Sequence, residues 1–266
     1  MTRVRLEPKK SNTIAPGWIV AIFGFCAAGL LFVFNFHTYR GGIDASTIST
    51  GTQTGIKKLP IASDDVFLIE GNVNGVPYYH CDGRGGNVIH MVLLHGSAFT
   101  KEDWKTSGIL EKFCRIPSLG VSAMDLPVSA NHEDLMSLLT AMREQKLVST
   151  PVTLVTPSAS GKTIIDWIMS TDGSVVDKLP SYVNRWIPIA TYGVSKFSTG
   201  HLDTLKKLDI STLAVYGDKD TNGKAVAGRL HQTGARLVEV PGAHPCYLDS
   251  PQVFVDKVLD FLGIST

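Results

Sequence analysis

The residues of this chain best suited to chemistry are a serine, an aspartate and a histidine that each follow a short apolar run. They are Ser158 after VTLVT (152–156), Asp220 after TLAVYG (212–217) and His244 after RLVEV (236–240). A serine hydroxyl becomes a strong nucleophile when a histidine removes its proton, and a carboxylate holds that histidine in the correct tautomer. The three residues therefore predict acyl transfer through an acyl-enzyme, with ping-pong kinetics.

The serine lies in the segment Pro-Ser-Ala-Ser-Gly-Lys-Thr (157–163), between a predicted strand and a predicted helix. A strand, a sharp turn with a serine at its tip and a helix form a nucleophile elbow. The sharpness of the turn requires small residues two positions before and after the nucleophile. For Ser158 these are Thr156 and Ser160, whereas for Ser160 one of them would be Lys162. Ser158 is therefore the predicted nucleophile.

The sequence predicts neither a metal nor an organic cofactor. It contains no H-E-x-x-H motif and no paired C-x-x-C motif. The ending Gly-Lys-Thr (161–163) resembles the last three residues of a phosphate-binding loop, but the first glycine of that motif would fall at Thr156. Nucleotide binding is therefore not predicted.

Two aspartates, Asp218 and Asp220, follow the same apolar run, and only one is expected to orient the histidine. Asp220 lies further into the loop and is freer to reach a histidine, while Asp218 is predicted to cap the turn. His244 lies in a Gly-Ala-His turn between a predicted strand and a predicted helix. The order serine, aspartate, histidine is that of the triad of α/β-hydrolases.

An oxyanion hole is predicted beside the nucleophile. The run IHMVLL (89–94) leads into His95, Gly96 and Ser97, and a loop at this position supplies one of the two N–H donors in hydrolases of this type. The backbone N–H groups of Ser97 and Ala159 are the predicted donors. His95 is predicted to brace the loop rather than to act as a second base.

Strand-like and helix-like runs alternate from Asp64 to the end of the chain. The predicted strands are 66–71, 76–81, 89–94, 121–126, 152–156, 186–190, 212–217 and 236–240, and the predicted helices are 131–145, 162–169, 223–232 and 251–262. This alternation is typical of an α/β domain with a mostly parallel central sheet flanked by helices. Functional residues of such sheets collect at the carboxyl ends of the strands, where all the predicted site residues lie.

Several motifs of the chain resemble one known family. They are Leu-Leu-His-Gly (93–96) with Trp104 downstream, Asp-Leu-Pro (125–127), Pro-Ser-Ala-Ser-Gly (157–161), Tyr-Gly-Asp-Lys-Asp (216–220) and Gly-Ala-His-Pro-Cys-Tyr-Leu-Asp (242–249). In these the chain is similar to the α/β-hydrolase domain-containing protein 14 family. The resemblance covers nearly all of residues 64–266, and the segment before them resembles the membrane-anchored A-type member rather than the soluble B-type.

The resemblance implies a compact α/β-hydrolase fold with a minimal lid, and it places the triad on Ser158, Asp220 and His244. It also implies esterase-like acyl chemistry, and for the B-type relative the transfer of an acetyl group from lysine to coenzyme A. A lumenal domain would not meet cytosolic coenzyme A, which argues against coenzyme A as the acyl acceptor of this chain. The chain departs from the family in Val-Ser-Ala-Asn (128–131), which replaces a glycine-rich stretch and leaves substrate preference open.

An uncharged segment near the amino terminus predicts a transmembrane helix. No charged residue lies between Lys10 and Arg40, and residues 18–34 are almost wholly apolar. A cleaved signal peptide is the alternative, but the apolar run is long for one and no A-x-A-like cleavage site follows it. Four Lys and Arg residues precede the segment and only Arg40 follows it closely, which predicts a cytosolic amino terminus and a type II orientation.

The predicted organisation is a basic cytosolic tail (1–16), a signal-anchor helix (17–39), a flexible stalk rich in Gly, Ser and Thr (40–63) and the hydrolase domain (64–266). The first 58 residues hold seven basic and two acidic residues, so the rest of the +1 chain is mildly acidic. That balance gives no electrostatic reason to expect a nucleic-acid partner. The 44% hydrophobic content excludes a disordered chain.

The cysteines leave the disulfide pattern open. Cys26 lies in the predicted anchor, and Cys81, Cys114 and Cys246 form an odd set in the domain, so at least one of them is unpaired within the chain. Taken together, the sequence predicts a membrane-anchored serine hydrolase that cleaves or transfers acyl groups of a small substrate. The alternative is a membrane-tethered adaptor whose hydrolase fold is catalytically silent.

Overall fold

One mostly parallel sheet runs through residues 57–60 and 67–265, which are the residues that the computed structural model describes. Its strands are β1 (Lys57–Pro60), β2 (Phe67–Val73), β3 (Val76–Cys81), β4 (Ile89–Leu93), β5 (Leu119–Met124), β6 (Val152–Pro157), β7 (Val183–Ile189), β8 (Ser211–Gly217) and β9 (Arg236–Val240). They lie in the order β1-β2-β3-β5-β4-β6-β7-β8-β9. The first three strands are antiparallel and add to β5, and the pairs from β5 through β4 and β6 to β9 are parallel.

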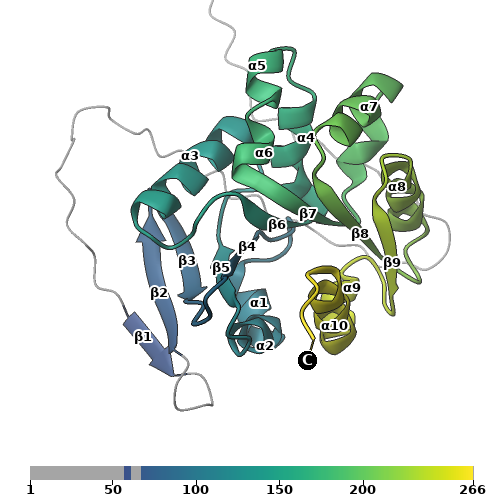
Figure 1. The fold of residues 1–266 in the computed structure, drawn as a ribbon. Coiled ribbons are helices and arrows are strands. Elements are labelled where there is room, and N and C mark those ends of the chain that lie inside the picture. The colour runs from purple at the N-terminus through teal and green to yellow at the C-terminus, as the bar shows by residue number, and fades with distance from the viewer. Residues whose placement is uncertain (1–56, 61–66, 266) are drawn as a thin grey trace, which may run out of the picture. The chain divides into compact units, whose positions relative to one another are not determined.

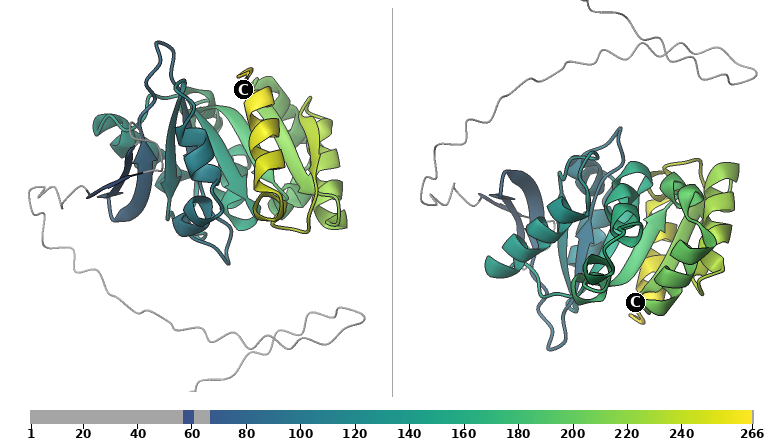
Figure 2. Two further views of the ribbon diagram at one scale, coloured as in Figure 1. Left: turned by 90° about the horizontal axis from the view of Figure 1, so that it is seen from below. Right: turned by 90° about the horizontal axis from the view of Figure 1, so that it is seen from above.

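Helices cover both faces of this sheet (Figures 1 and 2). One face carries α3 (His132–Glu144), α4 (Lys162–Ile168), α5 (Gly173–Val176), α6 (Leu179–Tyr182), α7 (Thr199–Lys207) and α8 (Thr221–His231). The other carries α1 (Lys101–Thr106), α2 (Ile109–Cys114), α9 (Cys246–Asp249) and α10 (Pro251–Phe261). Two short 3-10 turns, η1 (Ser158–Gly161) and η2 (Tyr192–Lys196), follow β6 and β7.

The apolar strand runs divide between two cores because successive side chains of a strand point to opposite faces. In β8, Ala214 and Tyr216 pack with α8 residues in one core, while Leu213 and Val215 pack with α10 residues in the other. Both sets are buried, which explains why the parallel strands read as continuous apolar runs rather than alternating ones. The fold is therefore the predicted three-layer α/β arrangement.

The predicted strands are all present, and the structure adds elements that the sequence analysis did not foresee. Residues 57–60, assigned to the stalk (40–63), instead form β1, which pairs with β2 at the edge of the sheet. The strand was missed because two of its four residues, Lys57 and Lys58, are exposed lysines rather than apolar residues. Such lysines are typical of edge strands. The short helices α1 and α2 were also missed, because six residues are too few for a clear helical period.

The predicted tail (1–16) and anchor (17–39) lie outside the described residues, as does most of the predicted stalk. Within residues 57–60 and 67–265, no helix has both the length and the apolar character needed to cross a membrane.

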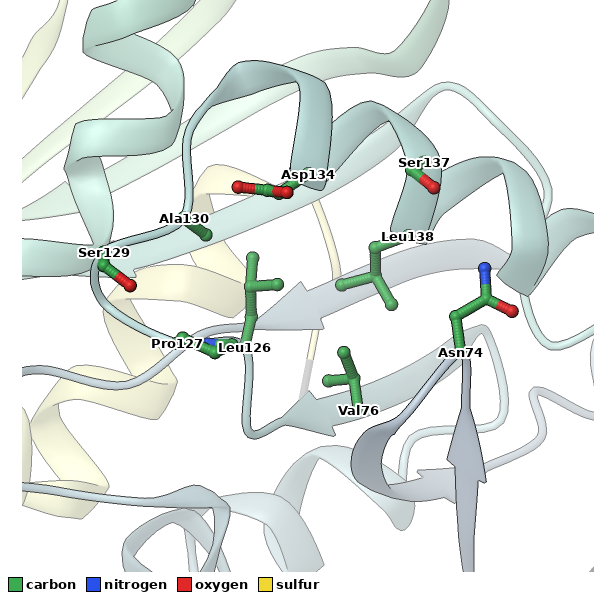
Figure 3. A pocket seen from close by; sticks show the side chains of 9 residues that line it. All are labelled: Asn74, Val76, Leu126, Pro127, Ser129, Ala130, Asp134, Ser137 and Leu138. Atoms are coloured by element: carbon green, nitrogen blue, oxygen red, sulfur yellow. The ribbon is translucent and has the colours of Figure 1, made fainter. Parts of the chain in front are cut away.

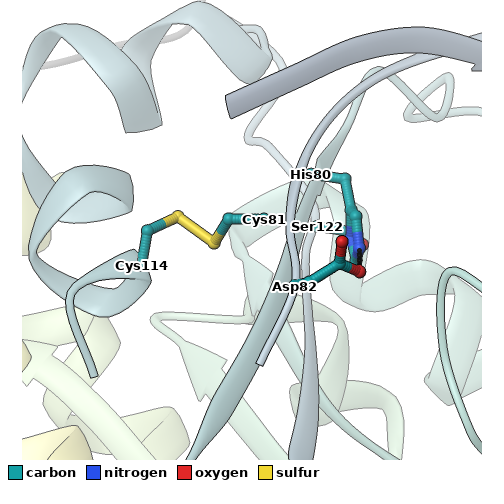
Figure 4. Close-up of a disulfide and its surroundings, with 5 residues drawn as sticks. All are labelled: His80, Cys81, Asp82, Cys114 and Ser122. Atoms are coloured by element: carbon teal, nitrogen blue, oxygen red, sulfur yellow. Dashed lines mark hydrogen bonds and ion pairs between the residues drawn. A yellow bond between two sulfur atoms is a disulfide. The ribbon is translucent and has the colours of Figure 1, made fainter. Parts of the chain in front are cut away.

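A disulfide joins β3 to α2 through Cys81 and Cys114, at a sequence separation of 33 (Figure 4). Both cysteines are buried in the core that contains α2. The pairing leaves Cys246 as a free, buried thiol. This pairing resolves the odd set of cysteines that the sequence left open, since Cys81 and Cys114 come close only when the sheet and α2 have formed.

Next to the disulfide, a buried histidine lies between a serine and an aspartate (Figure 4). His80 Nδ1 lies 2.8 Å from Ser122 Oγ, and its Nε2 lies 2.9 Å from Asp82 Oδ1. The serine is fully buried in β5, out of reach of a substrate. Burial lowers the pKa of His80 below the ordinary value of 6.5, and burial also lowers the pKa of the neighbouring His90.

These two histidines predict that acid destabilises the fold. Well above pH 6.5, the ordinary histidine pKa, both rings are neutral in the folded and unfolded chain. As the pH falls below that value, His80 and His90 bind protons more readily in the unfolded chain than in the folded chain. The free energy of unfolding therefore decreases. Denaturant unfolding of the full chain between pH 7.5 and about pH 5 should give this trend, with a shallower slope for His90→Gln. An unchanged slope in that variant would contradict the assignment.

Candidate active site

The turn after β6 holds Ser158 in a strained conformation at the carboxyl end of the strand. Its φ is +50°, in the left-handed region that a residue with a side chain rarely adopts. Strand β6 ends at Pro157, and the backbone turns through η1 directly into α4. This is the geometry of a nucleophile elbow, which carries the serine hydroxyl above the edge of the sheet.

The other residues of the elbow are packed too tightly to react. Ser160 is buried, and its hydroxyl donates to the Pro157 carbonyl at 2.9 Å. Thr156 is also buried and accepts a 2.8 Å hydrogen bond from the Trp186 indole. At Gly161 an added Cβ would overlap the side chain of Thr191, so the start of α4 can approach its neighbour this closely only with glycine. Of the two candidate serines, Ser158 alone has a free approach to the base.

The structure brings the three predicted triad residues together. His244 Nε2 lies 2.9 Å from Ser158 Oγ, and His244 Nδ1 lies 2.8 Å from Asp220 Oδ2. A proton on Nδ1 donates to the carboxylate, which leaves Nε2 free to accept the proton of the serine hydroxyl. Asp218 faces elsewhere and accepts the N–H of Gly242 at 2.8 Å, bracing the loop that carries the histidine. Their catalytic roles remain predictions.

The acid of this trio is held in its charged form. Burial alone would raise the pKa of the Asp220 carboxyl. The N–H of Gly223, which donates at 2.9 Å, and the His244 ring outweigh that effect, so the pKa lies below its ordinary value. Cys246 behaves differently, because burial raises the pKa of its thiol to about 12 and keeps it uncharged. A thiolate nucleophile at Cys246 is therefore disfavoured.

A tyrosine that the sequence analysis did not single out also reaches the trio. Tyr192, in η2 after β7, has its hydroxyl 3.1 Å from Asp220 Oδ1 and 2.9 Å from His244 Nδ1. Its ring stacks on the His244 ring, with centroids 4.7 Å apart and an interplanar angle of 28°. The one available signal in the sequence was its position just after a strand. No motif spacing marks such a residue.

The predicted oxyanion loop lies against the elbow. The Leu94 N–H donates to the Val155 carbonyl at 3.0 Å, and a Cβ added at Gly96 would contact the Pro157 carbonyl oxygen. Among the described residues the Ser97 N–H donates to no protein acceptor. The Ala159 N–H belongs to the first turn of a helical segment, where N–H groups have no partner within the helix. The loop that carries Ser97 thus lies beside the elbow, and Ala159 directly follows Ser158 in the chain. Their role as oxyanion donors stays a prediction.

A partly buried network of polar and charged groups braces the same loop. His95 Nδ1 lies 2.9 Å from the Gly96 carbonyl, and its Nε2 lies 3.9 Å from Asp125 Oδ1. Asp125 also accepts the backbone N–H of Lys101 at 2.6 Å, at the start of α1. The buried Lys101 ammonium lies 2.8 Å from the Glu102 carboxylate, which satisfies its charge. This supports the expectation that His95 stabilises the loop rather than acting as a base.

A shallow pocket of about 250 Å³ lies between the β2–β3 turn, the loop after β5 and α3 (Figure 3). The side chains of Val76, Leu126 and Leu138 point into it. Ser129 and Ala130, from the segment that departs from the family, also line it. The three predicted catalytic residues do not, and the volume is below the roughly 300–1,000 Å³ of ligand pockets, so it is not assigned as a substrate site.

Within the described residues, no cluster of three or more His, Cys, Asp or Glu side chains is placed to hold a metal ion.

The sheet order, the elbow and the serine, histidine and aspartate together define an α/β-hydrolase fold. The predicted CIB-like hydrolase of Thermoplasma acidophilum has this fold, with a TM-score of 0.55 and 22% identity over 78% of this chain and 99% of its own. No protein-family profile matches the chain.

Proteins of similar sequence indicate which family of α/β-hydrolases the chain belongs to. ABHD14B of Homo sapiens, named as a candidate protein-lysine deacylase, is 30% identical over 193 residues, which are 68% of this chain and 86% of that protein. ABHD14A of Danio rerio is 31% identical over 189 residues, 66% of this chain and 64% of that protein. The chain belongs to the α/β-hydrolase domain-containing protein 14 family. The nearly equal identities do not separate the A-type from the B-type, so the A-type resemblance stays a prediction.

Proposed function

We propose that the chain is a membrane-anchored serine hydrolase that cleaves or transfers acyl groups through Ser158, His244 and Asp220. The observation that carries the proposal is the continuous hydrogen-bonded relay from Ser158 Oγ through the imidazole to the Asp220 carboxylate. The positive φ of Ser158 adds to it, because backbone strain in a residue with a side chain is concentrated at functional sites.

In the proposed reaction, His244 Nε2 takes the hydroxyl proton while Ser158 Oγ bonds to the acyl carbonyl carbon. The N–H groups of Ser97 and Ala159 stabilise the oxyanion, and Asp220 stabilises the imidazolium. When the tetrahedral intermediate collapses, the imidazolium gives its proton to the leaving alcohol, thiol or amine. Water or another acceptor then attacks the acyl-enzyme, with His244 again as the base, and restores the free serine.

The substrate class within this proposal is an ester, thioester or amide of a small acyl group. The human relative is named as a candidate protein-lysine deacylase, which favours including acyl-lysine amides. A panel of esters, thioesters and acyl-lysine peptides with acyl chains of increasing length would rank them by kcat/KM.

The alternative is a catalytically silent adaptor at the membrane. Two observations favour the enzyme. The hydroxyl of Ser158 is hydrogen-bonded to His244, while the neighbouring Ser160 hydroxyl is used in a bond to the backbone. Ser158 also has a positive φ, and backbone strain of this kind is concentrated at functional sites.

The nucleophile is tested by a fluorophosphonate probe, which reacts only with activated serines. The full chain should label, Ser158→Ala should abolish labelling, and Ser160→Ala should retain most of it. Folded wild-type protein that resists the probe would support the silent adaptor. Labelling that survives Ser158→Ala and disappears in Ser160→Ala would place the nucleophile at Ser160 instead.

We also propose the type II orientation, with the domain on the lumenal or extracellular side. The Cys81–Cys114 disulfide supports it, because such bonds persist in oxidising compartments. In sealed microsomes containing the full chain, the domain should resist added protease until detergent is present. Digestion without detergent would refute the orientation.

A further inference from the structure

Tyr192 contacts both His244 and Asp220 of the predicted triad, through its ring and its hydroxyl. We propose that Tyr192 is a positioning residue of this site, with its hydroxyl donating to Asp220 and its ring stacked on His244, so that Nε2 stays directed at Ser158. The inference rests on the proposed hydrolase function and adds to it a residue that the sequence motifs do not assign.

The contacts of the hydroxyl define its role. It lies 3.1 and 3.3 Å from the two carboxylate oxygens of Asp220 and 2.9 Å from His244 Nδ1. Burial and the adjacent Asp220 carboxylate raise the pKa of Tyr192 to about 12, so the hydroxyl keeps its proton at neutral pH. Because Asp220 is ionised, the tyrosine proton is donated to the carboxylate, and the tyrosine oxygen can accept part of the Nδ1–H bond.

The stacked ring restricts the imidazole. An imidazole bound only through Nδ1 could swing about its χ angles and lose the 2.9 Å approach of Nε2 to Ser158. The tyrosine ring stacks on one face of the imidazole, with ring centroids 4.7 Å apart and an interplanar angle of 28°. It therefore blocks rotation of the imidazole toward that side. Tyr192 as a whole is 39% exposed, so it lies at the rim of the site and does not belong to the core.

The backbone around Tyr192 is fixed on both sides by close packing. Before it, the Thr191 hydroxyl donates to the Thr156 carbonyl at 2.9 Å, which ties the segment to the elbow strand. After it, a Cβ added at Gly193 would overlap Ile165 of α4, so η2 packs directly onto that helix. Ala190 has a φ of +46° and donates its N–H to Val215 of β8 at 2.9 Å. Strain at Ala190 is the cost of placing the tyrosine between the elbow and the acid loop.

The charged and titratable groups around the pair are few. Asp220 comes from the loop between β8 and α8, Ser158 from η1 and Tyr192 from η2. Asp218, in the same loop as Asp220, accepts the Gly242 N–H. Asp249 of α9 accepts the Ala243 N–H at 2.7 Å, and the Cys246 thiol of α9 is buried and uncharged. Of these groups only Asp220 is hydrogen-bonded to the Tyr192 hydroxyl, so a change at His244 in Tyr192→Phe arises from the lost hydroxyl, directly or through Asp220.

The tyrosine hydroxyl moderates the charge that faces the histidine. Its hydrogen bond helps to hold the pKa of Asp220 down. In Tyr192→Phe the carboxylate loses this donor, concentrates its charge on His244 Nδ1–H and stabilises the imidazolium more strongly. The acid limb of the kcat/KM profile is therefore expected to move to higher pH, with the limiting rate reduced about 3- to 10-fold and KM little changed.

Tyr192→Ala removes the ring as well and is expected to lower kcat about 10- to 100-fold further, because the imidazole loses its stacking partner. Tyr182→Phe is the matched control. Its hydroxyl lies 3.4 Å from Thr140 Oγ1, far from the triad, so the loss of this hydroxyl should move neither kcat nor the acid limb.

The decisive experiment measures the pH dependence of fluorophosphonate labelling rate and of ester hydrolysis for the full chain and these three variants. A shifted acid limb in Tyr192→Phe, absent in Tyr182→Phe, supports the proposal. Superimposable profiles for wild type and Tyr192→Phe would overturn it.

A second readout does not depend on turnover. The His244 ring of the histidine-labelled full chain is titrated by its imidazole nitrogen resonances, assigned with His244→Gln. Tyr192→Phe should raise the midpoint of this titration, and an unchanged midpoint would reject the role of the hydroxyl. A wild-type chain that never labels, combined with a shifted His244 midpoint, would reject the hydrolase function and retain the positioning role.

Discussion

Replacing Asp220 by asparagine is expected to lower kcat by about 10⁴-fold while leaving the fold intact, the loss that a wrong histidine tautomer causes in a serine triad. Two donors, the Gly223 N–H and the Tyr192 hydroxyl, already point at Asp220 Oδ1. They would take the amide oxygen of asparagine and turn its NH₂ group toward His244 Nδ1. The imidazole would then carry its proton on Nε2 and could not accept the proton of Ser158.

Asp218→Asn is the matched control for this prediction, because it lies two residues away in the same loop and accepts only a backbone N–H. Its kcat should stay within about tenfold of wild type, since an asparagine oxygen can still accept that N–H. Steady-state hydrolysis of an activated ester, with circular dichroism to verify folding, measures both. A large loss in Asp218→Asn with near-normal Asp220→Asn would reverse the assignment of the acid.

The second large effect is expected from Gly217→Ala at the end of β8. A Cβ at this position would overlap the carbonyl oxygens of Gly242 and Ala243, which are backbone atoms that cannot swing aside. We expect a loss of about 3 kcal/mol or more in the free energy of unfolding, at the upper end for overpacked sites. Relief of the overlap must displace the loop that carries His244, so kcat should fall as well.

Gly228→Ala is the corresponding control. Gly228 lies in α8 with no atom within 4 Å of an added Cβ. An alanine in a helix interior is favoured over glycine by about 1 kcal/mol, so this variant should be unchanged or slightly more stable. Denaturant unfolding of both variants measures the difference, and equal stabilities would contradict the close packing of β8 against the histidine loop.

The sequence predicted those parts of the site that follow a strand in a recognisable motif. Ser158, Asp220 and His244 each follow an apolar run, and their order along the chain matches the order of a hydrolase triad. The choice of Asp220 over Asp218 rested on loop position. Asp220 lies beside His244 and Asp218 accepts a backbone N–H, while the role of Asp220 as the acid stays a prediction.

Features that depend on which strands become neighbours could not be predicted. Tyr192 reaches Asp220 because β7 and β8 pair side by side, and no spacing in the sequence encodes that contact. The Cys81–Cys114 disulfide depends in the same way on the packing of α2 against the sheet. Strand β1 was hidden because its stability comes from pairing with β2 rather than from an apolar run of its own.

The most direct measurement of the central claim is the site of covalent attachment on the folded full chain. After reaction with a fluorophosphonate, intact mass spectrometry counts the adducts, and fragmentation of the tryptic peptide 147–162 separates Ser149, Ser158 and Ser160. We predict one adduct, on Ser158, that forms more slowly as His244 becomes protonated. An adduct on another residue, or none on folded protein, would contradict the account.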